Sequence, residues 1–106
     1  MSGKATQVPD AGAGIGDLDE VIHGRLRLGV MAYLAGQGTA SFPDLGARLE
    51  ATNGNLSTHL TKLEEAGYVR QEKGYNGKRP QTLVHLTDAG REAWIAYLEA
   101  MRGLIG

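Results

Sequence analysis

The spacing of apolar residues changes at Gly67, and this change constrains the fold more than any other feature of the chain. Before it, the leucines of residues 52–66 recur at the period of an amphipathic helix. After it, residues 68–73 and 81–86 alternate as two short strands do, and Asn76-Gly77 indicates a hairpin tip between them. The sequence therefore predicts a helix followed directly by a β-hairpin.

Two further helices precede this unit. Residues 18–34 carry apolar side chains at helical intervals, with a possible break at His23-Gly24. Ser41, followed three residues later by Asp44, resembles a capping box and opens a second helix of about ten residues. We expect this second helix to bury only a short apolar stripe.

The remaining helix boundaries are marked by capping residues. Thr52 is a plausible N-cap for the helix that ends at Gly67, which suits the position just beyond a helix. Thr87 and Asp88 begin a last helix that runs to about Leu104. The predicted fold class is α+β, mostly α, with the element order of a winged helix-turn-helix domain.

The composition indicates one domain with a tail. Residues 1–16 hold too few large apolar side chains to join a core, so we expect a flexible tail there and one domain over residues 17–106. A domain of this size is marginal alone and gains from oligomerisation. The absence of cysteine suits a reducing cytosol, and no apolar run approaches a membrane span or signal peptide. We expect a cytoplasmic protein without a membrane partner.

The charges are unevenly distributed although the formal net charge is −1. Residues 1–20 carry a net charge of −3, whereas residues 70–79 carry +3. Local basic clusters, not the overall charge, determine whether a protein attracts a polyanion. Lys73 and Lys78 are therefore candidates for phosphate contacts, and Arg79 for a phosphate or a narrowed minor groove. The alternative is that all three merely keep an exposed hairpin soluble.

The outer side of the helix over residues 52–66 is unusual for a helix that faces only water. Short polar side chains lower helix propensity, so they need another reason to be there. Asn forms two hydrogen bonds with adenine, Ser and Thr suit bases or phosphates, and a helix start attracts anions. The alternative is a solvated polar face. The predicted DNA-binding residues of this helix are Thr52, Asn53, Gly54, Asn55, Ser57, Thr58, His59 and Lys62.

The last helix carries more apolar side chains than docking onto its own core requires. One stripe would suffice for docking, so the excess indicates a second covered surface, most simply another subunit. The alternative is one wide buried face. The two stripes consist of Trp94, Leu98, Met101 and Ile105, and of Ala93, Tyr97, Ala100 and Leu104.

Over about residues 18–104 the chain resembles small bacterial winged-helix transcriptional regulators allied to the MarR and ArsR groups. The resemblance rests on LDEVIHGRLRLGVMAYL, FPDLGARLEATNGNLSTHLTKLEEAGYV and LTDAGREA. It implies a DNA-binding homodimer built from the first and last helices, with the third helix in the major groove and the hairpin wing on the backbone or minor groove. The implied dimer interface comprises Leu18, Ile22, Trp94, Tyr97, Leu98, Met101, Leu104 and Ile105.

The chain departs from these families in the return strand of the wing. Gln81, Leu83 and His85 stand where further basic residues are more common. We expect weaker non-specific DNA binding as a result.

Two arginines lie near the start of the first helix. Arg25 and Arg27 are close in sequence to Asp17, Asp19 and Glu20, so we expect ion pairs within the chain or with a partner chain. The resemblance implies a structural role for Arg27.

Other functions have less support. His23, His59 and His85 show no metal-ligand spacing, so we expect neither a metal nor a cofactor. The run GAGIG at residues 12–16 has no preceding strand, and no nucleophile has a base at recognisable spacing, so we expect no enzyme.

The remaining rival is a winged helix used for protein contacts, because fold alone does not settle function. Such a surface would favour exposed aromatic residues or leucines on the third helix. The effector, the target and the direction of regulation are not readable. A ligand cavity at the dimer interface near Tyr33, Trp94 and Tyr97 is a hypothesis.

Overall fold

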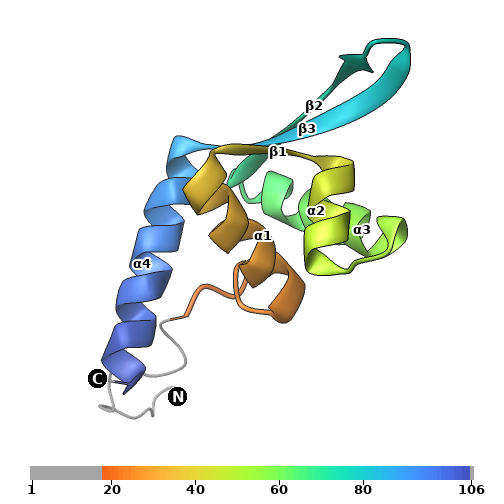
Figure 1. Cartoon of the computed structure of the whole chain (residues 1–106). Coiled ribbons are helices and arrows are strands. Elements are labelled where there is room, and N and C mark those ends of the chain that lie inside the picture. The colour runs from red at the N-terminus through yellow and green to blue at the C-terminus, as the bar shows by residue number, and fades with distance from the viewer. Residues whose placement is uncertain (1–17, 106) are drawn as a thin grey trace.

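A computed structural model describes residues 18–105 as a winged helix-turn-helix domain, which confirms the predicted fold class (Figure 1). The element order matches the prediction, with one short strand added before the second helix. The predicted tail over residues 1–16 lies outside the described residues. The elements are α1 (Arg25–Gln37), β1 (Thr39–Ser41), α2 (Phe42–Leu49), α3 (Asn53–Glu65), β2 (Val69–Asn76), β3 (Arg79–Leu86) and α4 (Asp88–Ile105).

The first helix begins later than the predicted residue 18. Residues 18–23 form a turn in which the Asp19 carboxylate accepts a hydrogen bond from the Val21 N–H at 2.8 Å. Gly24 then adopts a φ of 138°, a conformation that favours glycine, and α1 starts at Arg25. The possible break at His23-Gly24 is therefore the true start of the helix.

The sheet has three antiparallel strands in the order β1-β3-β2. β2 and β3 pair along their whole length, and Asn76 opposite Arg79 is the last pair before the tip. Gly77 and Lys78 thus form the turn, with a φ of 68° at Gly77, as in a type II′ hairpin. The tip lies one residue beyond the predicted Asn-Gly pair.

The third helix ends as predicted, at Gly67. Its φ is 83°, and its N–H donates to the Glu64 carbonyl at 2.9 Å. The Tyr68 N–H donates to the Leu63 carbonyl at 3.0 Å, which completes a Schellman motif. This arrangement turns the chain directly from α3 into β2.

Thr87 connects the start of α4 to this corner. Its hydroxyl donates to the Gly67 carbonyl at 2.6 Å and accepts from the Gly90 N–H at 2.9 Å, so the predicted N-cap is confirmed. A Cβ at Gly90 would lie 2.1 Å from the Tyr68 carbonyl oxygen. Only glycine therefore allows α4 to pack this close to the end of α3.

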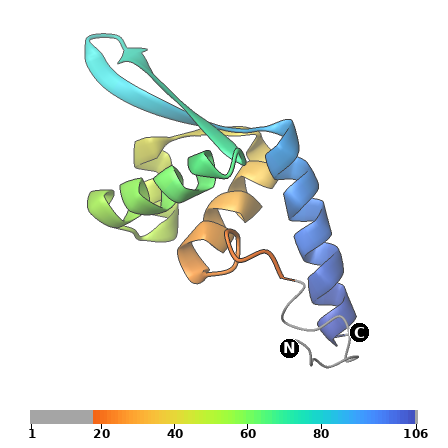
Figure 2. The same ribbon diagram turned by 180° about the vertical axis from the view of Figure 1, so that it is seen from behind.

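The core lies where α1, α3, the sheet and α4 meet, with α1 placed between α3 and α4 (Figures 1 and 2). The three leucines of α3 are fully buried, which confirms the predicted inward stripe. Among the described residues, no polar or charged residue is fully buried. The buried apolar residues are Leu18, Ile22, Val30, Met31, Leu34, Ala40, Leu45, Leu56, Leu60, Leu63, Val69, Val84 and Tyr97.

None of the helices described between residues 18 and 105 has the length and apolarity that crossing a membrane requires.

Candidate nucleic-acid interface

The outer face of α3 is polar and open to solvent. The Thr52 hydroxyl accepts a hydrogen bond from the Asn55 N–H at 3.2 Å, which confirms this residue as the N-cap. Thr61 donates its hydroxyl proton to the Ser57 carbonyl at 3.0 Å, so the helix partly satisfies its own polar side chains. The exposed residues among those predicted to bind DNA are Thr52, Asn53, Gly54, Asn55, Ser57, Thr58 and Lys62.

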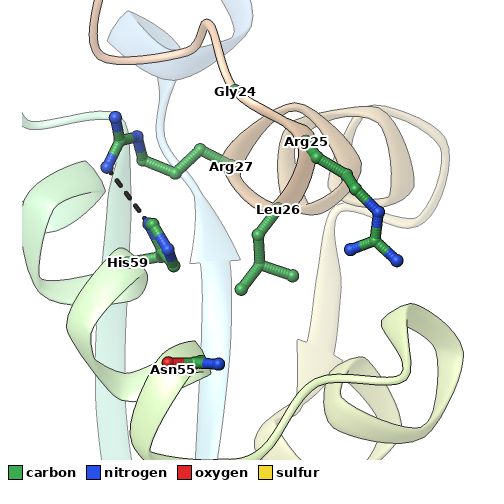
Figure 3. A pocket seen from close by; sticks show the side chains of 6 residues that line it. All are labelled: Gly24, Arg25, Leu26, Arg27, Asn55 and His59. Carbon is green, nitrogen blue, oxygen red and sulfur yellow. Dashed lines mark hydrogen bonds between the residues drawn. The ribbon is translucent and has the colours of Figure 1, made fainter.

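His59 differs from its neighbours because it is half-buried against the start of α1 (Figure 3). Arg27 approaches its Nδ1 atom to 3.1 Å and donates its Nε–H to the Val21 carbonyl at 2.6 Å. Because an arginine can only donate, Nδ1 is the acceptor and the imidazole proton is assigned to Nε2. Desolvation, then the charges of Arg27 and Lys62, lower the pKa of His59.

The expected ion pairs of the first arginines are absent from residues 18–105. Arg27 bonds to Val21 and His59, and Asp19 instead accepts a hydrogen bond from the Tyr68 hydroxyl. This hydrogen bond, helped by burial, raises the pKa of Tyr68 to about 12. The acidic segment is therefore fixed to the corner after α3, whereas pairing with Asp17 lies outside the described residues.

The wing projects beyond the body of the domain beside α3 (Figure 1). Lys73, Lys78 and Arg79 are exposed along it, at the positions that the sequence predicted for phosphate contacts. The sequence prediction did not include Tyr75. This residue is 76% exposed, and its backbone lies opposite Pro80 where β2 pairs with β3. A large exposed aromatic side chain among cations gives the wing an apolar contact as well as charge.

The base of the wing is held by side-chain contacts of His85. His85 Nε2 lies 2.8 Å from a Glu72 carboxylate oxygen, and its Nδ1 lies 2.9 Å from the Thr39 hydroxyl. His85 therefore connects all three strands of the sheet.

Three residues predicted for the dimer interface belong to the subunit core instead. Ile22 is 0%, Tyr97 3% and Leu18 7% exposed within the single chain, so they have almost no surface for a second subunit. Leu18 and Ile22 lie in the turn before α1, and Tyr97 lies on the inner side of α4. All three pack into the core. Tyr97 also stacks on Trp94 at 5.9 Å, and its hydroxyl lies 3.0 Å from His23 Nδ1.

The outer side of α4 retains the other candidates. Leu98 is 46%, Leu104 40% and Ile105 82% exposed, and Ile95, which the sequence prediction omitted, is 51% exposed. Trp94 and Met101 are half-buried between the two sides. An apolar stripe therefore faces outward, one helix face away from the stripe that packs on the core.

Two further expectations concern ligands. Tyr33 donates its hydroxyl proton to Asp44 at 2.9 Å and lies under the Arg48 guanidinium, so its polar contacts are with α2, whereas Trp94 stacks on Tyr97. Within residues 18–105, no group of three or more His, Cys, Asp or Glu side chains is placed to hold a metal.

Comparisons with known proteins agree on a winged-helix family. A family model described as a winged helix DNA-binding domain matches residues 26–105. An uncharacterized protein from Methanocaldococcus jannaschii is 34% identical over 79 residues, covering 74% of this chain and 86% of its own. A transcriptional regulator homologue from Pyrococcus horikoshii OT3 superposes with a TM-score of 0.75 at 33% identity, over 80% of this chain and 84% of that one.

More distant solved structures are longer than this chain. A MarR family transcriptional regulator from Silicibacter pomeroyi has a TM-score of 0.63 at 25% identity, over 79% of this chain and 56% of that one. Reduced AbfR, solved bound to DNA, has a TM-score of 0.66 at 27% identity, over 73% of this chain and 55% of that one. These similarities confirm the resemblance that the sequence motifs indicate.

Proposed function

Because the chain belongs to the winged helix DNA-binding domain family, we propose that it is a sequence-specific transcriptional regulator that binds an inverted-repeat operator as a homodimer. Similarity to MarR-type regulators supports the class of function, and the solved DNA complex of AbfR supports DNA as the partner. We infer from the exposed side chains of this chain which residues contact DNA and which form the dimer interface.

The observation that carries the proposal is the contrast within α3. Its three leucines are fully buried, and its outer face exposes only small or polar side chains beside an exposed basic wing. A surface for protein docking would expose large apolar side chains, whereas base edges are read by amides and hydroxyls. We therefore place α3 in the major groove, with Asn53 and Asn55 near the bases.

The wing supplies the sequence-independent part of the affinity. Lys73 and Lys78 contact the phosphate backbone in this proposal, and Arg79 lies at the position from which it reaches a phosphate or a minor groove. Lys62 lies further along α3 and adds a charge beside the groove. Each such contact releases a counterion when DNA binds, so the affinity depends on salt.

The dimer is formed by the outward stripe of α4. Exposed Ile95, Leu98 and Ile105 give this helix an apolar face that a second copy covers by two-fold symmetry. A two-fold dimer places its two recognition helices about one helical turn apart, so the half-sites lie roughly 10 bp centre to centre.

Selection of bound duplexes from a random pool, followed by affinity measurements at several salt concentrations, tests the proposal. If Lys62, Lys73, Lys78 and Arg79 each neutralise one phosphate in both subunits, about eight counterions are released, and log affinity falls with log salt at a slope of roughly −7. We expect an enriched inverted repeat with this steep slope. No enriched sequence and a slope near zero would contradict the proposal and favour a protein-docking role.

A further inference from the structure

A cleft of about 290 Å³ lies between the start of α1 and the first turns of α3 (Figure 3). Leu26 forms its floor, and Asn55 and His59, one helical turn apart on α3, form one side. Arg27 turns toward His59, whereas Arg25 extends on the other side of α1 (Figure 3). Two guanidinium groups therefore flank the cleft from its two ends.

The charged side chains that line this cleft are both positive. Its lining includes both arginines and no carboxylate. Acidic side chains line the adjoining hollows, Glu20 and Glu65 with Arg27 and Glu50 with Arg25. Within residues 18–105, however, neither arginine has a carboxylate oxygen within 4.0 Å. The cleft is thus suited to an anion from outside the chain.

Two of the polar groups in the cleft, the side chains of Arg27 and His59, are held in place as donors. Arg27 uses two N–H groups to bind Val21 and His59, which holds its guanidinium still and leaves its other N–H groups available. The same contact leaves the Nε2–H of His59 as a donor. Donors held in position lose little conformational entropy on binding.

The position of the cleft identifies the anion. In both overall views α3 lies between the wing on one side and the start of α1 on the other (Figures 1 and 2). A duplex that receives α3 in its major groove presents a phosphate backbone at each edge of that groove. The wing accounts for one edge, and the cleft lies at the other.

We propose that this cleft binds the DNA backbone at the edge of the major groove away from the wing, with Arg25 and Arg27 contacting its phosphates. The inference rests on the proposed function and adds to it a second phosphate-binding surface. Its four further contacts in the dimer would steepen the expected salt slope from roughly −7 to roughly −11. α3 is then held from both sides, so that its short polar side chains reach base edges in a fixed register.

Replacement of single operator phosphates by neutral methylphosphonates tests this inference. We expect wild-type protein to lose affinity at phosphates on both edges of the groove. Arg25→Gln should lose sensitivity at the phosphate that Arg25 contacts on the edge away from the wing, and should keep it at the phosphate that Arg27 contacts and at the wing edge. Its salt slope should become shallower by about 2, one contact in each subunit. Arg25 is exposed and forms no side-chain hydrogen bond among the described residues, so folding should be unaffected.

Arg91→Gln is the charge control, because it removes the same charge from an exposed position of α4. It also removes a 3.4 Å hydrogen bond to the Ala35 carbonyl, so thermal unfolding of this variant is measured alongside. Arg91→Gln should leave the phosphate profile and the slope unchanged. An Arg25→Gln profile identical to that of wild type would overturn the inference while leaving DNA binding intact, whereas failure of wild type to bind any duplex would overturn the proposed function itself. Saturable shifts of Asn55 and His59 signals with inorganic phosphate alone, together with an unchanged Arg25→Gln profile, would assign the cleft to a free anion and also overturn it.

Discussion

The helices α3 and α4 both pack an inner side on the core but present different outer surfaces. On α3 three leucines are fully buried, and the exposed residues are Asn, Gly, Ser, Thr and Lys, with two glutamates confined to the C-terminal end. On α4 the inner side buries Gly90 and Tyr97, and the outer side exposes Ile95, Leu98 and Ile105. In the proposed function, α3 contacts a polyanion and α4 contacts a second subunit.

The difference shows why inward periodicity alone does not define a function. Both helices satisfy the rule that one stripe packs on the core. Only the outward residues distinguish them, because apolar area left in water favours association with another apolar surface, and a small polar surface does not.

The largest effect is expected inside α3. Leu60→Ala removes a fully buried side chain and leaves a cavity, so the free energy of unfolding should fall by about 2–5 kcal/mol. Thr61→Ala, at the exposed neighbouring position, should change it by less than about 0.5 kcal/mol. Chemical denaturation measures both. Equal losses would mean that the two sides of α3 are not distinguished as described.

The next effect is expected on the outer side of α4. Leu98→Asp should weaken self-association on the order of 100-fold, about 3 kcal/mol, because it places a charge within the apolar stripe of each subunit. Sedimentation over a concentration series measures it, with Glu99→Gln as the exposed control on the same helix. If Leu98→Asp associates as strongly as wild type, this stripe is not the dimer interface.

A smaller effect is expected at the polar side of α3. Asn55→Ala should reduce discrimination at one base pair of each half-site by about 1–3 kcal/mol, because an amide can bond a base edge in two places. The thermal stability of the free protein should hardly change, since this side chain is exposed. Competition binding with single-base operator variants measures the discrimination. A uniform loss on all sequences would assign Asn55 to the backbone instead.

The smallest effect concerns pH. Burial and Arg27 lower the pKa of His59 from the ordinary 6.5, so near that pH the unfolded chain binds more protons than the folded one. Stability should therefore be fully present above pH 6.5 and decrease as the pH falls below it. Comparing wild type with His59→Gln by thermal unfolding isolates this contribution from the other histidines. The same pH dependence in both proteins would contradict it.

Capping residues predicted several helix ends, and the spacing of apolar residues predicted the buried side of α3. Thr52, Gly67 and Thr87 occupy the cap positions that local sequence indicates, because capping depends on residues within one helical turn. The leucines of α3 followed from spacing alone. Strand β1 was not predicted, since its three residues pair with β3 more than forty residues later.

The errors have a common physical cause, which is that spacing does not show which apolar stripe meets which neighbour. Leu18 and Ile22 pack into their own subunit because a turn, and not a helix, precedes α1. The close approach of Gly90 to the Tyr68 carbonyl and the Arg27–His59 contact join parts of the chain that are distant in sequence. No local sequence pattern predicts such contacts. The exposed residues of α3 and the wing lie where the sequence placed them, and their DNA contacts stay a prediction.

The most direct test of the central claim compares the two helices in one experiment. Backbone amide NMR signals of the protein are followed while the selected operator duplex is added. The account predicts large shifts for residues 53–62 and for the wing, with the outer residues of α4 unaffected by DNA. Shifts concentrated on Ile95, Leu98 and Ile105, with α3 unchanged, would contradict it.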